Sequence, residues 1–304
     1  MRTAFFGIFC AFLGVAAPAM AQERVTLGYG RLFTNDFLGD GQDRWRSGSY
    51  AISKVKGPRW TGSLPAGFGD LIEYRVRTEI MAPSNLSNGA PGDRRYTGAL
   101  SFGVHTRFQP AETEFSLGAD IVITGPQTRI GDFQRDIHGL IGATDPSAVL
   151  QNQIGDGFYP TFTSEAGRVF RLSDRAMLRP FVELQAGAET LFRAGADVMF
   201  GPVGQSDLML RDVTTGQLYR ATREEGSGLS LTLGADIASV ADSVYLPGSD
   251  GYTLTDTRDR LRMGIHWQGV GGTSAFYGLT WLGREFENQP EGQLVGSLQL
   301  NFIF

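Results

Sequence analysis

The feature that most constrains the fold is a regular alternation of apolar and polar side chains, which recurs along the chain in stretches of about ten residues. At the C-terminal end, every second position from Leu294 to Phe304 is apolar or glycine, and Ser297, Gln299 and Asn301 lie between them. A period of two predicts β-strands with two unlike faces. About ten residues is also the length that a tilted strand needs to cross a membrane.

A soluble β-sandwich alternates too, so strand length and the polar face decide between the two folds. Strands of soluble proteins average about five to six residues, about half the length of these. One stretch carries Glu73, Arg75, Arg77 and Glu79 on a single face. Burying such a face is tolerable when it lines a polar lumen where opposite charges can pair. We therefore predict an all-β fold, an antiparallel transmembrane β-barrel of the bacterial outer membrane.

Counting the alternating stretches predicts about twelve strands, an even number that places both chain ends on the periplasmic side. The candidates are 25–34, 47–56, 68–80, 95–108, 112–124, 161–172, 176–188, 191–201, 228–239, 258–269, 274–286 and 292–304. The link at 202–227 is long for a periplasmic turn. Either it forms a hairpin of its own or the count is locally wrong. No segment resembles an interdomain linker, so we expect residues 22–304 to form one domain.

The N-terminal residues 1–21 have the pattern of a secretory signal peptide. Arg2 supplies positive charge, an apolar run follows at 5–17, and Ala19-Met20-Ala21 is a small-x-small cleavage signal. Cleavage would remove Cys10, the one cysteine, and this excludes disulfides, a cysteine nucleophile and thiolate metal sites. The formal net charge of −5 argues against nucleic acid as a partner.

The main chemical lead lies in the stretch 121–154, which begins as an alternating strand, breaks at Gly125-Pro126 and becomes helical. We expect a short helix in an extracellular loop. Gln134 and His138 are four residues apart, so both side chains project from the same face of this helix. His138 is either a solvated loop residue or a general base, since histidine titrates closest to neutral pH.

Other polar groups fall at the same predicted end of the barrel. Asn35-Asp36 is either a turn or part of a site for a hard cation, because carboxylate and amide oxygens suit Ca²⁺. The pairs Asp43-Arg44 and Asp93-Arg94 could be ordinary surface ion pairs. Two further interpretations are structural: His105 and His266 fill a polar lumen, and Tyr50, Tyr96 and Trp267 belong to aromatic belts at the membrane surface.

Several catalytic classes are excluded by their motifs. The sequence has no G-x-S-x-G elbow and no H-E-x-x-H zinc motif. Gly139 and Leu140 follow His138, so the His-x-Ser pair of some outer-membrane acyl hydrolases is absent.

Three motifs resemble the outer-membrane lipid A 3′-O-deacylases, the LpxR family. They are TNDFLGDGQDRWRSG at the end of the first strand, PSNLSNGAPGDRRYTG at 83–98, and GADIVITGPQTRIGDFQRDIHGLIG with the following NQI. The match runs in order along nearly the whole mature chain. The resemblance implies a twelve-stranded barrel that uses Ca²⁺ to hydrolyse the 3′-linked acyloxyacyl chain of lipid A, which reaches the site laterally from the outer leaflet.

By the same resemblance, His138 is the general base that activates water. Asn35, Ser47 and Gln134 complete the catalytic set, and Asp36, with Ser47, is the metal ligand. Two departures are visible. Family members commonly carry threonine where Ser47 stands, and the loop 84–92 lacks the lysine used by a characterised member. Arg94 could replace that lysine as the substrate-binding group.

We expect a monomer with lipid A or lipopolysaccharide as its partner. Two other functions remain open from the sequence. The first is a non-catalytic porin or structural barrel, which would show no effect of Ca²⁺ or of changing His138. The second is an outer-membrane phospholipase, which would process glycerophospholipids as readily as lipid A.

Overall fold

The computed structural model describes residues 24–302, so the predicted signal peptide and Phe304 lie outside the described residues. The strands are β1 (Val25–Asn35), β2 (Trp45–Gly57), β3 (Leu71–Ala82), β4 (Thr97–Phe108), β5 (Thr113–Thr124), β6 (Gly157–Arg168), β7 (Phe170–Ser173), β8 (Ala176–Ala186), β9 (Glu189–Phe200), β10 (Met209–Arg211), β11 (Leu218–Arg220), β12 (Gly228–Ser243), β13 (Arg258–Gln268), β14 (Ser274–Leu282) and β15 (Gln293–Asn301). The helices are η1 (Asp36–Leu38), η2 (Pro126–Thr128), α1 (Ile130–Ile141), α2 (Ser147–Leu150) and η3 (Gly248–Asp250).

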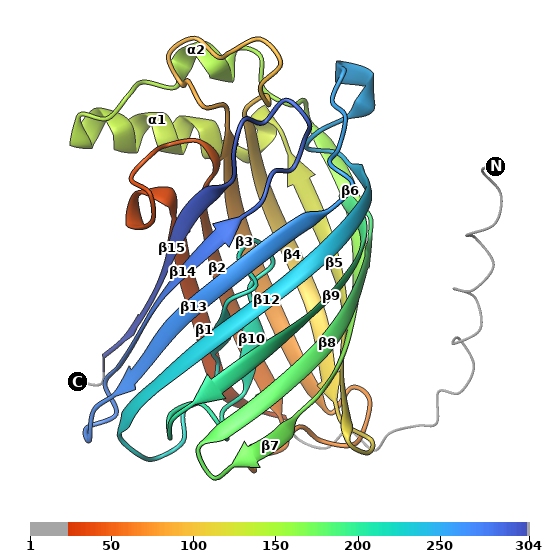
Figure 1. Ribbon diagram of the computed structural model, residues 1–304, viewed down its shortest axis with the longest axis vertical. Coiled ribbons are helices and arrows are strands. Elements are labelled where there is room, and N and C mark those ends of the chain that lie inside the picture. The colour runs from red at the N-terminus through yellow and green to blue at the C-terminus, as the bar shows by residue number, and fades with distance from the viewer. Residues whose placement is uncertain (1–23, 303–304) are drawn as a thin grey trace, which may run out of the picture.

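The long strands form one closed antiparallel barrel (Figure 1). Their order is β6-β5-β4-β3-β2-β1-β15-β14-β13-β12-β9-β8, and pairing of β6 with β8 closes the ring. The short strand β7 continues the ladder beside β8. The predicted fold class and the count of twelve barrel strands are confirmed. None of the helices among residues 24–302 is long and apolar enough to cross a membrane.

Some strand ends differ from the prediction because each strand extends as far as a neighbour can pair with it. The sixth barrel strand begins at Gly157 rather than at 161, because Gly157 already pairs with Thr124 of β5. β12 continues to Ser243 rather than 239, and Ser243 pairs with Glu189. Hydrophobic alternation gives no information about such pairing, which joins residues that are distant in sequence.

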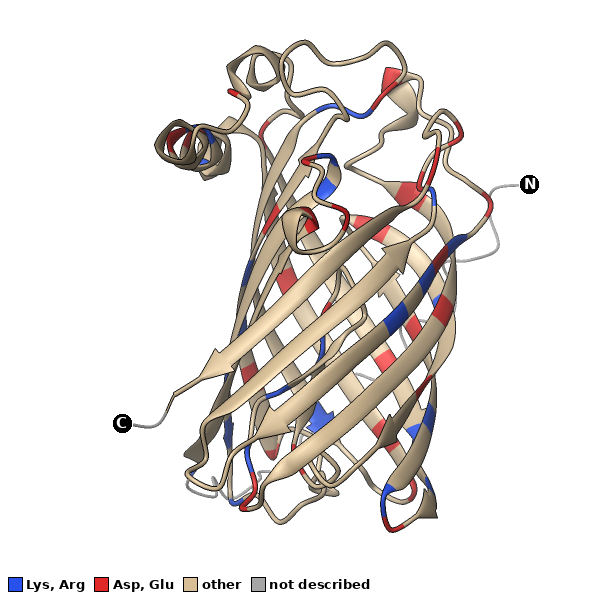
Figure 2. Ribbon diagram, turned by 60° about the vertical axis from the view of Figure 1, so that its left-hand side comes forward, with Lys and Arg blue, Asp and Glu red and all other residues tan. Residues whose placement is uncertain are grey.

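The lumen is lined by paired charges, as the alternation of Glu73 and Arg75 predicted. Arg75 lies 2.7 Å from Glu73, and Arg107 contacts the other carboxylate oxygen of Glu73 at 3.2 Å. Figure 2 shows acidic and basic positions distributed along the strands. His105 and His266 are both buried in the lumen, as predicted.

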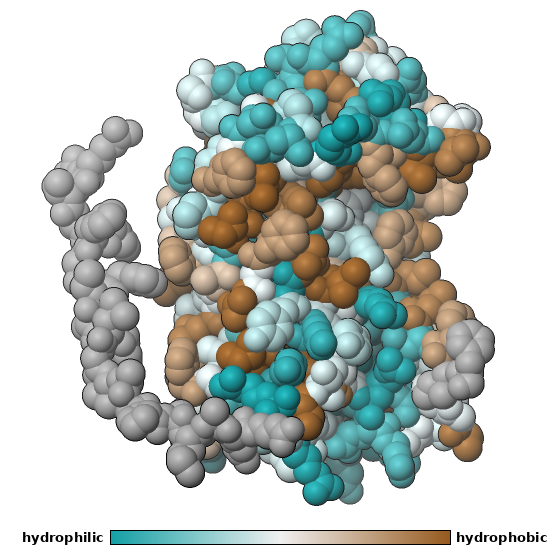
Figure 3. Space-filling model, turned by 180° about the vertical axis from the view of Figure 1, so that it is seen from behind, coloured by the Kyte–Doolittle hydropathy of each residue, from teal (hydrophilic) through white to brown (hydrophobic). Residues whose placement is uncertain are grey.

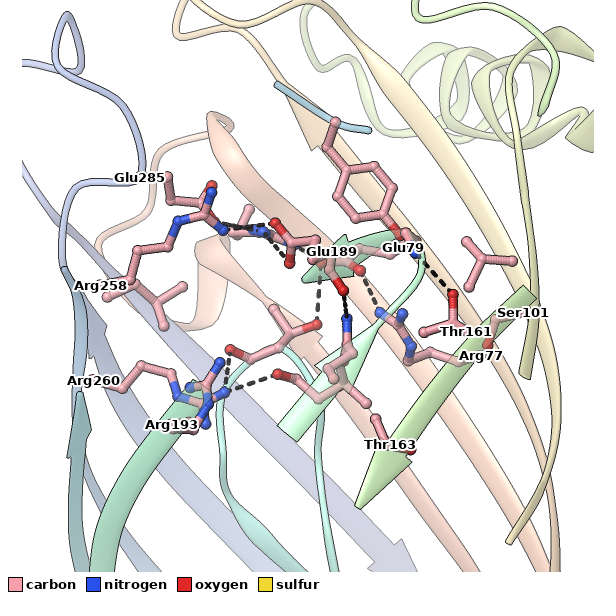
Figure 4. A pocket seen from close by; sticks show the side chains of 18 of the residues that line it. Arg77, Glu79, Ser101, Thr161, Thr163, Glu189, Arg193, Arg258, Arg260 and Glu285 are labelled. Carbon is pink, nitrogen blue, oxygen red and sulfur yellow. Dashed lines mark hydrogen bonds and ion pairs between the residues drawn. The ribbon is translucent and has the colours of Figure 1, made fainter. Parts of the chain in front are cut away.

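A second group of charges surrounds a cavity of about 80 Å³ towards the extracellular end of the lumen (Figure 4). Arg46 contacts Glu79 at 2.6 Å and Glu285 at 2.5 Å. Arg258 contacts Glu189 at 2.7 Å. A buried ionic network therefore occupies much of this part of the lumen, next to a small apolar cluster that includes Val122, Ala188 and Tyr245.

The outer face of the barrel carries the apolar side chains. Figure 3 shows them across the middle of one face, with hydrophilic side chains over the top. Tyr50 and Trp267 are exposed on this outer side, which is consistent with their predicted place in aromatic belts. The same prediction for Tyr96 is wrong: this residue is fully buried among Ala82, Leu86 and neighbouring side chains.

Residues 202–227 form the hairpin β10–β11, and Figure 1 shows it inside the barrel. This resolves the ambiguity of the sequence in favour of a separate hairpin. Tyr219 and Leu210 of the hairpin pack against Leu32 and Phe276 of the wall. Arg211 contacts carboxylates of two wall strands, Glu165 at 2.6 Å and Asp197 at 2.8 Å. The hairpin therefore plugs the lumen through both apolar and ionic contacts.

We expect Arg211→Ala to lower the free energy of unfolding by about 3 kcal/mol, because the change removes one partner from a buried ionic network. Unfolding by urea in detergent measures this difference. Arg175→Ala is the control, because Arg175 is exposed in the turn before β8. An equal loss of stability in both variants would show that the ion pairs do not hold the hairpin.

Candidate active site on the outer wall

The loop helix predicted at the break in the stretch 121–154 is α1. Gly125 has a φ of 89°, a backbone conformation that favours glycine, and Pro126 begins the short helix η2. Arg129 also has a positive φ, of 59°, and directs the chain into α1. The helix ends at Gly142, which has a φ of 71° and takes the usual C-terminal role of glycine.

Both α1 and η1 lie on the outer side of the barrel wall. Gly98 is on the outward face of β4, and a Cβ there would lie 2.9 Å from Ile130 of α1. Gly296 is on the outward face of β15, and a Cβ there would lie 2.5 Å from the Cβ of Leu38 in η1. Glycines at these two positions allow the helices to approach the wall closely, near its extracellular rim.

Four side chains meet between α1 and the wall. His138 Nε2 lies 3.1 Å from Asp43 Oδ2. Gln134 Nε2 lies 3.4 Å from Asp43 Oδ1 and 3.4 Å from His138 Nε2. Ser47 donates its hydroxyl hydrogen to Asp43 Oδ1. The structure thus brings the predicted Gln134, His138 and Ser47 together around one carboxylate.

The orientation of His138 is fixed by the main chain. Its Nδ1 lies 2.5 Å from the carbonyl oxygen of Thr144, which can only accept a hydrogen bond. This contact places a proton on Nδ1 and directs Nε2 towards Asp43 and Gln134. A neutral His138 therefore presents an unprotonated Nε2 to the site, and this is the form that a general base requires.

Ser47 owes its position to an irregularity in β2. The pairing of β2 with β3 shifts between Arg46 and Gly48, which leaves Ser47 without a partner on β3. Such a bulge can aim a side chain out of the regular alternation. Two residues earlier, the buried Trp45 has a φ of 49°, a strained value for a bulky residue.

Asn35 and Asp36 lie at the adjacent end of β1. Asn35 Nδ2 donates to the Ser47 carbonyl oxygen at 3.0 Å, and Asn35 Oδ1 accepts from the Phe37 N–H at 2.9 Å. The amide of Asn35 therefore ties the β2 segment to η1. Asp36 is buried, and its Oδ2 accepts from the Arg44 N–H at 2.9 Å.

The Asp36 carboxyl is suited to a cation. Burial raises its pKa to about 8, opposed by the Arg44 N–H and reinforced by the nearby charge of Asp43. Among residues 24–302, no basic side chain lies within ion-pair distance of Asp36, whereas Glu73 and Glu79 in the lumen are paired with arginine. A bound cation would stabilise the charged form of Asp36.

Hard cations such as Ca²⁺ bind carboxylate, amide, main-chain and water oxygens. Asp36 and Asp43 are the residues that would hold one, and the buried Gln134 Oε1 nearby lacks a hydrogen-bond partner among the described residues. In the same part of the chain, no three His, Cys, Asp or Glu side chains form a ready metal cluster. Besides these side chains, main-chain, water or substrate oxygens would complete the coordination. Ser47 is predicted as a metal ligand; its hydroxyl donates its hydrogen to Asp43, and the hydroxyl oxygen keeps lone pairs that could face a cation.

Arg94 does not join this group. Its guanidinium is fully buried, and Nη1 lies 2.5 Å from Glu285 Oε2 in the lumen network. A lipid that approaches along the outer wall cannot reach a side chain in this position. The predicted substrate-binding role of Arg94 is therefore not supported. Its side chain points into the lumen because it pairs with Glu285, which is distant in sequence.

The interpretation of Asp43 as half of a surface ion pair with Arg44 was wrong. Arg44 pairs with Asp40 at 3.2 Å and Glu291 at 2.7 Å, which leaves Asp43 free to contact His138. The sequence holds only a weak indication that Asp43 belongs to the site. Asp43 precedes Ser47 by four residues, in a loop that is rich in acidic residues.

The cavity of about 80 Å³ in the extracellular part of the lumen is not lined by Asp43, Ser47 or His138. The polar cluster on the outer wall and this cavity in the lumen are therefore separate features.

Comparison with known proteins identifies the family. The family model described as "Outer membrane protein LpxR" matches residues 7–304. The chain belongs to the LpxR family. Among solved structures, LpxR from Salmonella typhimurium matches with a TM-score of 0.75 at 17% identity, over 91% of this chain and 100% of that chain. A KdgM porin in complex with disordered oligogalacturonate matches with a TM-score of 0.40 at 5% identity, over 92% and 100%. No curated protein sequence matches this chain.

The family assignment confirms the resemblance seen in the sequence motifs. It also agrees with the twelve-stranded barrel and with its place in the outer membrane. Within this LpxR-family barrel, the polar cluster of Asp36, Asp43, Ser47, Gln134 and His138 is the candidate active site.

Proposed function

We propose that this LpxR-family barrel is a Ca²⁺-dependent esterase that removes the 3′-O-linked acyloxyacyl chain of lipid A. The observation that carries the proposal is the location of the cluster around His138 and Asp43. It lies outside the barrel wall, under α1 and beside η1, near the extracellular rim. A lipid of the outer leaflet would meet the site from the side, whereas a solute crossing the lumen would not.

The proposed reaction begins when His138 Nε2 takes a proton from a water molecule and the water oxygen bonds to the ester carbonyl carbon. The ester C–O bond then breaks, and the proton passes from Nε2 to the departing alkoxide oxygen on lipid A. Asp43, 3.1 Å from Nε2, stabilises the imidazolium between the two proton transfers. Ser47 and Gln134 hold the Asp43 carboxylate in place.

Ca²⁺ held by Asp36 and Asp43 would polarise the ester carbonyl and stabilise the negative charge that develops on its oxygen. With this contribution no protein nucleophile is required. That agrees with the position of the Ser47 hydroxyl, which bonds to Asp43 rather than to His138.

The porin alternative is disfavoured by the interior of the barrel. The hairpin β10–β11 occupies the lumen, and the network around Arg46 and Glu285 fills the extracellular part. We expect the purified protein to give no steady conductance in a planar lipid bilayer. A phospholipase remains the second candidate, because the same geometry would hydrolyse any ester that reaches the outer wall.

Incubation of the purified protein with lipid A and Ca²⁺, followed by mass spectrometry, tests the proposal. We expect loss of one acyloxyacyl group from the 3′ position and little hydrolysis of phosphatidylethanolamine in the same vesicles. Equal hydrolysis of the phospholipid would favour the phospholipase. Unchanged lipids, with the barrel shown to be folded by its heat-dependent mobility in gels, would contradict both enzymatic functions.

A further inference from the structure

An exposed apolar stripe runs along α1, next to the face that carries His138. Phe133, Leu140 and Ile141 have exposed fractions of 62%, 82% and 71%, and Ile137 lies between them on the same side. Spacings of three and four residues place these four side chains on one stripe of the helix. Soluble proteins rarely leave such a contiguous group in water.

The remaining surface of α1 divides into two other faces. Gln134 and His138 point towards the barrel wall and are buried. Asp132 and Arg135 lie on the side away from the stripe and pair with each other at 3.0 Å. A helix with one strongly charged face and one large apolar stripe is the kind that lies in the plane of a membrane surface.

The position of α1 makes this stripe continuous with the lipid-facing surface of the barrel. Ile130, in the first turn, covers Gly98 on the outward face of β4. Farther down the same face, Phe102 and Val104 are exposed in the apolar band of the barrel. Figures 1 and 2 both show α1 projecting beyond the barrel wall at the extracellular end.

A second exposed apolar side chain lies next to the polar cluster, on η1. Phe37 of η1 is exposed, and it directly follows Asp36. The polar cluster is therefore flanked by exposed apolar side chains from both helices. A polar cluster with apolar side chains on either side suits a position at the level of the membrane where acyl chains meet headgroups.

We propose that α1 is seated in the outer leaflet, with the stripe Phe133, Ile137, Leu140 and Ile141 in contact with lipid acyl chains. Contact with the acyl chains explains why the stripe stays uncovered by protein, and the charged face with Asp132 and Arg135 then faces the headgroups and water. The helix thereby holds His138 at the depth where the ester bonds of a membrane lipid begin. This placement rests on the fold and its membrane location rather than on the proposed hydrolysis.

Site-directed spin labelling tests the placement directly, and the mature sequence suits it because Cys10 lies in the predicted signal peptide. A nitroxide at Leu140→Cys is measured in phospholipid vesicles, against Arg135→Cys on the charged face and Val270→Cys in the turn between β13 and β14. Val270 is 94% exposed at the opposite end of the barrel. Accessibility to oxygen reports contact with acyl chains, and accessibility to a water-soluble nickel complex reports contact with water.

We expect the label at position 140 to be accessible to oxygen and protected from nickel, and the labels at 135 and 270 to show the reverse. Equal nickel accessibility at 140 and 135 would overturn the proposal, because it would place the whole helix in water. Protection of position 140 from both reagents would also overturn it, because a protein surface would then cover the stripe. Neither measurement depends on enzymatic activity.

A kinetic test examines the consequence of this placement and rests on the proposed function. The double variant Leu140→Gln/Ile141→Gln is expected to deacylate lipid A in vesicles about tenfold more slowly, since weaker seating lowers access to the lipid. Its rate in detergent micelles should stay close to that of the wild type, and Arg135→Gln should change neither rate. A parallel loss in micelles would indicate damage to the site. An inactive wild type would contradict the proposed function and leave the spin-label result intact.

Discussion

Replacing His138 with alanine should reduce lipid A deacylation by about 10³-fold, within the range that a general base contributes. The expectation follows from three contacts around the ring. Thr144 fixes the proton on Nδ1, and Nε2 lies within reach of Asp43 and Gln134. Without the imidazole, water at the site loses the base that the proposed reaction uses. Initial rates from mass spectrometry measure the loss.

Chemical rescue distinguishes loss of the base from general damage to α1. Adding imidazole to the His138→Ala protein should restore part of the activity, because the freed space next to Asp43 can accept the free base. Asp136→Asn is the matched control, since Asp136 is an exposed residue on the same helix, and its rate should equal that of the wild type. A His138→Ala protein with near-normal activity would exclude His138 as the base.

The barrel could be predicted from the sequence because each face of its strands meets a different environment. The lumen side must pair its charges, as Glu73 does with Arg75 and Arg107, and the lipid side must be apolar, as at Phe102. Both requirements leave a local pattern. The hairpin β10–β11 left no comparable pattern, because its strands have only three residues each and its contacts are with residues throughout the chain.

The candidate site was predicted less completely, and the reason is again the distance between partners in the sequence. Gln134 and His138 share a helix face, so their proximity follows from local geometry. Asp43 reaches Gln134 across 91 residues, and Arg94 reaches Glu285 across 191. Asp43 and Arg94 each belong to an Asp-Arg pair in the sequence. The residues next to each pair do not indicate that Asp43 joins the site whereas Arg94 enters the lumen.

Removal of Ca²⁺ by a chelator should lower the deacylation rate by about 10³-fold, equivalent to about 4 kcal/mol of transition-state stabilisation. The structural basis is Asp36, a buried carboxyl group whose pKa burial raises to about 8 and which lacks a basic partner among the described residues. Asp36→Asn keeps the size of the side chain and an oxygen for the Arg44 N–H, but it removes the charge. We expect this variant to remain inactive at Ca²⁺ concentrations that saturate the wild type.

Binding can be measured separately from catalysis. Ca²⁺ that binds the folded barrel should raise the unfolding temperature of the wild type and leave that of Asp36→Asn unchanged. Asp40→Asn is the matched control: Asp40 lies in the same loop but is already paired with Arg44 at 3.2 Å, so its variant should keep the Ca²⁺ response. A Ca²⁺ response that survives in Asp36→Asn would place the cation elsewhere. The buried Asp36 carboxyl would then have the main-chain N–H groups of Arg44 and Phe37, and no cation, to oppose the rise in its pKa that burial causes.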